Sequence, residues 1–204
     1  MLPSGAMLAL CLLLLAAEGP PFIYWGARPA IVEFESAGAT SDEARVLEFH
    51  AAWDAKDLVL RFSFDRPVRD ALRLADGTPV SGRLKAVLYV DTDDDRSTGT
   101  QEGGADLRTG AERRLELGAV TMAADPEEQR EASVLVAATL HGLGRDGRRR
   151  TLWRADDEDA GRVRVHGDAV ELRVPEDSIG SVGTLRLVVV SGDTARDGRL
   201  RARP

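Results

Sequence analysis

Short runs in which apolar and polar residues alternate, separated by turn-forming residues, make up most of the chain. Two such runs, Arg45–Trp53 and Leu58–Phe64, flank the polar stretch Asp54–Asp57. Alternation with a period of two is typical of strands that bury one face, and it predicts that Leu47 and Phe49 share the buried face of the first run. Two strands separated by so short a polar segment predict a β-hairpin.

The same criterion predicts strands along the rest of the chain. They lie at Ile31–Glu35, Leu84–Val90, Glu112–Leu117 with an extension toward Met122, Ser133–Leu140, Thr151–Arg154, Arg162–His166, Ala169–Val174 and Leu185–Val190, with a frayed edge at Arg199–Arg201. Short helical or irregular segments are expected at Val68–Leu74, Ala124–Arg130 and Pro175–Gly180, each of which follows or contains a proline. About eight to ten short strands without a long amphipathic helix predict an all-β fold, an antiparallel β-sandwich of jelly-roll type.

The N-terminus has the character of a targeting segment. Residues Ala6–Ala17 form an apolar run, which matches the apolar region of a signal peptide and is shorter than the about 20 residues of a membrane-spanning helix. No Lys or Arg precedes it, and Leu15 fits poorly at the third position before a cleavage site that follows Ala17. Residues 1–19 are therefore interpreted as a signal peptide, or as an uncleaved anchor that extends through Phe22–Trp25. Either interpretation predicts a protein outside the cytoplasm, periplasmic or secreted.

Domain organisation and partners follow from length and composition. Residues 20–44 are expected to form a linker with a first strand, and residues 45–204 a single β-sandwich domain long enough for a sizeable core. The net charge of −7 weighs against nucleic acid and anionic membrane surfaces, because both require clustered Lys and Arg. Membrane contact is expected only through an uncleaved N-terminal segment. Cys11 is the single cysteine and lies in the apolar run, so no disulfide is expected.

The densest cluster of carboxylates follows the apolar run Leu84–Val90. It reads D-T-D-D-D-R-S-T-G and continues through a glycine-rich stretch into the next predicted strand. Acids so close in sequence repel one another unless water solvates them or a hard cation binds among them. Calcium takes about six to eight oxygen ligands, which this loop supplies. The candidate ligands of a calcium ion are Asp91, Asp93, Asp95, Thr98, Glu102 and Glu112.

An EF-hand does not account for the cluster. Asp91, Asp93 and Asp95 occupy the first, third and fifth places of the EF-hand register and Glu102 the twelfth. However, Arg96 stands where that loop requires glycine, and the preceding segment is predicted to be a strand rather than a helix. The alternative to a cation site is a surface loop whose solvated acids keep the protein soluble.

Several motifs resemble those of a known group of domains. The segments Y-V-D-T-D-D-D-R-S-T-G, G-A-E-R-R-L-E-L, V-E-L-R-V-P-E-D-S-I-G and A-W-D-A-K-D-L-V-L-R-F are similar to elements of bacterial exported β-sandwiches related to family 9 carbohydrate-binding modules and DOMON-like domains. The resemblance implies a jelly-roll-like sandwich and calcium or sugar binding. The chain departs from the carbohydrate-binding relatives in having few aromatic residues. The positions that match the acidic motif are Asp91, Asp93, Thr98, Gly99, Gly110, Ala111 and Glu112.

A second candidate site lies around Trp153. This residue follows the basic run Arg148–Arg150, and an exposed ring beside cations is a suitable platform for an acidic glycan. Trp153 and Arg150 are therefore the candidate ligand-binding residues. The alternative is that the tryptophan packs at the end of a hairpin and that the arginines form an exposed turn.

No catalytic motif accompanies these candidates. The chain lacks G-x-S-x-G, a phosphate-binding loop and H-E-x-x-H. The sequence therefore predicts a non-catalytic exported binding module with a structural calcium ion and a carbohydrate or another extracytoplasmic ligand. Two alternatives remain. One is a structural or adhesion module of the cell envelope, and the other is a hydrolase or glycosidase accessory domain, whose paired carboxylates would be defined by space rather than by sequence.

Overall fold

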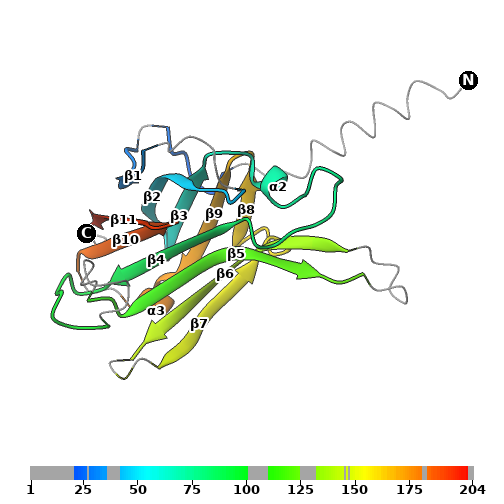
Figure 1. Ribbon diagram of the computed structural model, residues 1–204. Helices are drawn as coiled ribbons and strands as arrows, with labels where there is room; N and C mark the ends of the chain where they lie inside the picture. Colours follow the sequence, from blue (N-terminus) through cyan, green and yellow to red (C-terminus); the bar gives the residue numbers. More distant parts are fainter. Residues whose placement is uncertain are drawn as a thin grey trace, which may run out of the picture.

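Two antiparallel β-sheets pack face to face in the computed structural model (Figure 1). It describes residues 21–26, 28–35, 42–100, 110–124, 132–144, 146, 148–180 and 183–201. The five-stranded sheet has the order β1 (Val32–Glu33), β2 (Val46–Asp54), β3 (Asp57–Phe64), β9 (Ala169–Pro175) and β8 (Val163–His166). The six-stranded sheet has the order β11 (Thr194–Leu200), β10 (Leu185–Ser191), β4 (Lys85–Asp91), β5 (Arg113–Met122), β6 (Ser133–Leu143) and β7 (Arg149–Asp156). The predicted all-β antiparallel sandwich is confirmed.

Two short helices complete the described elements. They are α2 (Val68–Ala71) and α3 (Glu176–Ile179), each of four residues, so neither approaches the length needed to cross a bilayer. Both fall in segments predicted to be helical or irregular. The segment preceding residue 21, with the predicted signal or anchor, lies outside the described residues, as does most of Ala124–Arg130.

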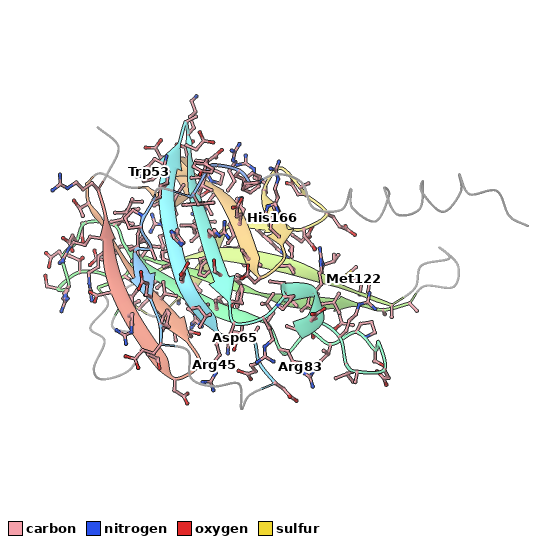
Figure 2. The ribbon with its side chains drawn as sticks, turned by 90° about the horizontal axis from the view of Figure 1, so that it is seen from above. Arg45, Trp53, Asp65, Arg83, Met122 and His166 are labelled. Atoms are coloured by element: carbon pink, nitrogen blue, oxygen red, sulfur yellow. The ribbon has the colours of Figure 1, made fainter. Side chains whose placement is uncertain are left out.

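The predicted β2–β3 hairpin is present, with Ala55 and Lys56 as its two-residue turn. Its open end is closed by Arg45 and Asp65, which lie near one another in Figure 2: the Asp65 N–H donates to the Arg45 carbonyl oxygen (3.0 Å). A β-bulge near the start of β2 inserts an extra residue and changes which side chain faces inward. As a result Val46 is buried in the core, whereas Leu47, predicted to be inward, is half-buried.

The main core lies between the two sheets. Phe49 and Phe62 pack in a tilted arrangement with ring centroids 4.9 Å apart, and the inward leucines of the opposite sheet, such as Leu88 and Leu115, are completely buried. Each such side chain contributes about 1.5–3 kcal/mol through burial. Phe49 is a residue that alternation predicts to face inward, because a period of two places every second side chain on the same face.

A smaller apolar cluster covers the outer face of the six-stranded sheet. Val87 and Tyr89 of β4 pack there with Val188 of β10 and with Ala111, which directly precedes β5. The strand β4 is therefore apolar on both faces. The contact with Ala111 fixes the end of the long β4–β5 loop against the sheet and determines where its acidic residues lie.

Candidate functional site

The β4–β5 loop begins and ends on adjacent strands. Asp91 is the last residue of β4, and Glu112 directly precedes β5. The N–H of Glu112 donates to the Val90 carbonyl oxygen (3.1 Å), so residues far apart along the loop are held side by side. Antiparallel pairing of β4 with β5 thus brings carboxylates from both ends of the loop to one place.

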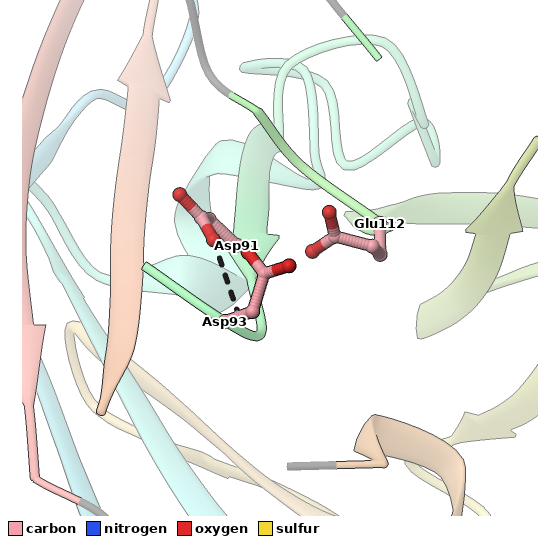
Figure 3. A group of neighbouring side chains, drawn as sticks. All are labelled: Asp91, Asp93 and Glu112. Atoms are coloured by element: carbon pink, nitrogen blue, oxygen red, sulfur yellow. Dashed lines mark hydrogen bonds between the residues drawn. The ribbon is translucent and has the colours of Figure 1, made fainter. Parts of the chain in front are cut away.

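Three carboxylates converge at this place. Asp91, Asp93 and Glu112 each offer one oxygen atom, and these atoms lie within 4.8 Å of one another. Figure 3 shows the Asp93 and Glu112 carboxylates directed toward one another, with Asp91 beside them. Asp91 is 1% exposed. Its Oδ1 accepts a hydrogen bond from the Asp93 N–H (3.3 Å), while its Oδ2 is buried without a hydrogen-bond partner among the described residues.

The hydroxyl group of Thr98 lies among more acceptor oxygens than it can satisfy. Its Oγ1 is 3.0 and 3.1 Å from the two carboxylate oxygens of Asp93, 3.1 Å from Oε1 of Glu112 and 2.8 Å from the Asp95 carbonyl oxygen. A hydroxyl group has one hydrogen to donate, and ionised carboxylates and carbonyls have none. Most of these contacts therefore place two oxygen atoms together without a hydrogen between them.

Positive φ angles close the loop around these oxygens. Asp94, Gly99 and Gly110 have φ angles of 54°, 63° and 58°. A Cβ atom on Gly99 would overlap the carbonyl oxygens of Gly110 and Ala111 and Oε1 of Glu112. Glycine is required at position 99 for two reasons, because the backbone is left-handed and because these oxygens approach it closely.

Ion pairs attach the outer part of the loop to the edge of the sheet. Asp94 pairs with Arg199 of β11 (3.0 Å), and Arg96 with Asp197 of the same strand (3.5 Å). Asp197 also accepts a hydrogen bond from the buried Arg186 of β10 (2.9 Å). Exposed pairs of this kind contribute little individually, about 0–1 kcal/mol, so they orient the loop more than they stabilise the fold.

The acidic residues of the loop differ in their proton affinity. The pKa of Asp91 is raised to about 6, first because burial disfavours the ionised carboxylate and further because Asp93 and Glu112 lie close to it. Hydrogen bonds from the hydroxyl and backbone N–H of Ser97 instead lower the pKa of the Asp95 carboxyl. A cation near Asp91 would offset the repulsion that raises its pKa.

Of the six candidate calcium ligands, the structure brings four together. Asp91, Asp93 and Glu112 form the carboxylate group, and the Thr98 hydroxyl contacts two of them. The Asp95 carboxylate instead accepts from the Ser97 hydroxyl (2.7 Å) and N–H (2.9 Å), and only its carbonyl oxygen reaches Thr98. Glu102 lies outside the described residues.

The second candidate site was predicted around Trp153. Trp153 is half-buried and packs against the main core. Arg150 is exposed on β7. This packing corresponds to the alternative considered for Trp153.

A buried glutamate on the outer face of the five-stranded sheet was not anticipated from the sequence. Glu171 of β9 is 0% exposed and accepts hydrogen bonds from the Phe22 N–H (2.7 Å) and the Trp25 indole N–H (2.6 Å). The guanidinium groups of Arg164 and Arg173 lie 4.2 and 4.8 Å from the centre of the Phe22 ring. We call residues 21–26 the N-terminal strap, because they lie across this sheet.

Two further side chains lie beside the same carboxylate. Arg61 of β3 and His166 of β8 each have a nitrogen atom 3.8 Å from an oxygen of Glu171, and Figure 2 labels His166 on its strand. The ring of His50 lies 5.6 Å from that of Trp25. The strap and β1 therefore extend the packed domain into the segment expected to be a linker.

Comparisons of the chain with protein-family models, with curated proteins and with solved structures found no match. Function is therefore inferred from the geometry of the molecule. The resemblance to family 9 carbohydrate-binding modules and DOMON-like domains stays a prediction.

Proposed function

We propose that this protein is an exported, non-catalytic β-sandwich binding module whose β4–β5 loop holds a calcium ion. The observation that supports the cation most strongly is the position of the Thr98 hydroxyl, within 3.1 Å of four acceptor oxygens. One hydrogen cannot serve them all. A divalent cation among these oxygens would replace the missing hydrogens and neutralise the carboxylates around it.

The composition of the donor set favours calcium over other metals. Asp91, Asp93 and Glu112 supply carboxylates, and Thr98 and main-chain carbonyls lie beside them. A set made entirely of oxygens suits a hard cation, whereas zinc prefers nitrogen and sulfur. Carboxylates that can bind through one or both oxygens, together with carbonyls, are typical of calcium rather than of the strict octahedron of magnesium.

The buried Asp91 supports the same conclusion independently. An ionised carboxylate that is 1% exposed with an unpartnered Oδ2 costs free energy unless a cation or proton accompanies it. In an extracytoplasmic environment that contains calcium, binding of the cation would keep the Asp91 carboxylate ionised at neutral pH. The ion would then have a structural role, because it closes the loop between two central strands.

Export is proposed from the apolar N-terminal run, and a binding role from the lack of any catalytic motif in the sequence. A structural or adhesion module of the cell envelope would share the calcium site and differ in having no soluble ligand.

Isothermal titration calorimetry of metal-free protein tests the cation. We expect one calcium ion to bind per chain and magnesium to bind at least tenfold more weakly. Glu112→Gln, which removes one of the converging charges, should weaken calcium binding at least tenfold, whereas the matched surface change Glu158→Gln should not alter it. Absence of calcium binding to the folded wild-type protein would refute the site.

A further inference from the structure

A groove crosses the outer face of the six-stranded sheet, on the side of the sheet that faces away from the main core. Its larger part, about 390 Å³, lies over β4, β5, β6 and β7. A second hollow of about 360 Å³ shares Lys85, Val87 and Arg114 with the first and continues past Tyr89. We call the two together the outer-face groove. Their volumes lie in the range of ligand-binding pockets.

Small side chains form the floor of the larger part. Gly118 of β5 pairs with Lys85 of β4 on one side and with Ala137 of β6 on the other. Both small residues line the groove. The absence of bulk at these two neighbouring positions is what makes the face hollow, because each outward side chain on a sheet would otherwise fill the space above its own strand.

The larger part of the groove carries an excess of positive charge, although the chain has a net charge of −7. Lys85, Arg114 and Arg154 line it against one carboxylate, Glu116. Glu116 is already engaged, since its Oε1 lies 3.1 Å from Arg114 and 3.4 Å from Arg149. Within the described part of the chain, no ion pair involves Lys85 or Arg154.

Lys85 and Arg154 stand on opposite sides of the hollow. Lys85 is on β4 and Arg154 on β7, three strand positions apart. Adjacent strands are separated by about 4.8 Å, so three spacings place these backbones about 14 Å apart across the sheet. Thr139, which pairs with both Glu116 and Arg154, adds a hydroxyl group between them. Separated charges with a hydroxyl group between them suit an extended ligand that carries anionic groups at intervals.

We propose that the outer-face groove binds an acidic polysaccharide through its carboxylate groups, with Lys85 and Arg154 as the principal anion contacts. This inference rests on the proposed binding function and names its ligand class. Charge complementarity supports it. The spacing favours a sugar polymer over nucleic acid, which would require a continuous basic track. Glu43 and Asp193 line the far end of the groove and would repel a densely charged polyanion.

The groove also differs from the site predicted from the basic run. Arg150 is not among the residues that line either hollow, and Trp153 packs on the core side of β7. The groove is instead continuous with the calcium loop through Tyr89, which packs against Ala111. A cation in the loop would therefore stabilise one wall of the groove without contacting the ligand.

Binding of an oligogalacturonate tetramer, measured by titration calorimetry at low ionic strength in the presence of chelator, tests the proposal. The chelator prevents free calcium from bridging the oligomer. We expect binding of the charged tetramer, and no binding of its fully methyl-esterified form. Lys85→Gln combined with Arg154→Gln should weaken binding at least tenfold, Lys85→Arg should retain it, and Lys56→Gln, a change of the other lysine in an exposed turn, should leave it unchanged. Binding should also weaken with added salt.

Several outcomes would overturn the proposal. They are an absence of binding by the folded protein, equal binding of the methyl ester, tighter binding of poly-glutamate, or a loss of affinity in Arg150→Gln with Lys85→Gln unaffected. Far-UV circular dichroism verifies that each variant is folded. Calcium titration without glycan tests the proposed cation site separately, so a failure of the groove and a failure of the calcium site give different results.

Discussion

The hydroxyl oxygen of Thr98 lies 3.1 Å from Oε1 of Glu112. This contact joins the first half of the β4–β5 loop to the residue that precedes β5. The same hydroxyl touches both carboxylate oxygens of Asp93. A single side chain thus connects the groups proposed to bind calcium.

Replacement of the hydroxyl group tests its role in the site. Thr98→Val keeps the shape of the side chain and removes its oxygen, so calcium affinity should fall about tenfold, which corresponds to about 1.4 kcal/mol. Titration calorimetry measures the change. Thr121→Val, at an exposed position on β5, is the matched control. Equal calcium affinity in Thr98→Val and wild type would show that the hydroxyl is not a ligand.

Asp91→Asn should have effects of opposite sign with and without calcium. In chelator at pH 7.5 the variant should unfold at a higher temperature than wild type, because it removes a buried charge whose pKa is raised to about 6. With calcium the variant should be less stable than wild type, since one ligand charge is lost. Differential scanning calorimetry measures both. Asp95→Asn should change calcium affinity little, because that carboxylate is bonded to Ser97.

The pH dependence of stability follows from the same shift. The pKa of the Asp91 carboxyl is about 6 in the folded protein, above its ordinary value of 3.8, so the folded state binds the proton more tightly. Without calcium, this group's contribution to the free energy of unfolding should therefore fall as pH rises from about 4 through 6 and then stay constant. The contribution of Asp91 is obtained by subtracting the pH profile of the free energy of unfolding of Asp91→Asn from that of the wild-type protein. A difference that rises with pH in chelator would contradict the assigned environment.

With calcium present, the pH dependence of the Asp91 contribution to the free energy of unfolding should have the opposite sign. Metal binding requires the ionised carboxylate and releases its proton. Stabilisation by calcium should therefore be larger at pH 7.5 than at pH 4.5. Denaturant titrations at the two pH values, with and without calcium, provide the comparison.

The N-terminal strap should contribute to stability through Glu171. In Glu171→Gln one of the two hydrogen-bond donors, the Phe22 N–H or the Trp25 indole N–H, would face an amide NH₂ group instead of an acceptor. The expected cost is about 1–3 kcal/mol, or a melting temperature lower by about 2–4 °C for each kcal/mol. Tyr24→Phe is the control, since that side chain is 81% exposed. An unchanged melting temperature would show that the strap is not part of the cooperative fold.

The sandwich could be predicted from sequence because its burial follows a period of two. In β5, for example, Leu115 and Leu117 are buried and Glu116 is not. The bulge in β2 could not be predicted in this way, since Val46 and Leu47 are both apolar and alternation does not indicate where a register shift occurs.

The acidic site was predictable in part. The oxygen-rich loop indicated Asp91, Asp93, Thr98 and Glu112 as candidates, and the acidic motif of the resemblance includes the same four residues. Only the pairing of β4 with β5 brings Glu112 near the others. The Asp95 carboxylate was not predictable in this way, because it accepts a hydrogen bond from the nearby Ser97 N–H instead of joining the other carboxylates.

Glu171 and the groove were not accessible from sequence. Within V-E-L-R-V the glutamate occupies an outward position, which predicts exposure to solvent, but its partner Trp25 is 146 positions away. Likewise, Lys85 and Arg154 face the same groove only because the pairings of β4 with β5, β5 with β6 and β6 with β7 place both residues on one sheet. Local patterns do not encode such long-range placements.

The most direct test of the calcium site is the thermal unfolding of the purified protein in calcium and in chelator. At a calcium concentration 100-fold above the dissociation constant, binding to the folded state should add about 2.7 kcal/mol to the free energy of unfolding. The melting temperature should then rise by about 5–11 °C, and the rise should be absent in Glu112→Gln. Identical melting temperatures for the wild-type protein in calcium and in chelator would contradict the proposed site.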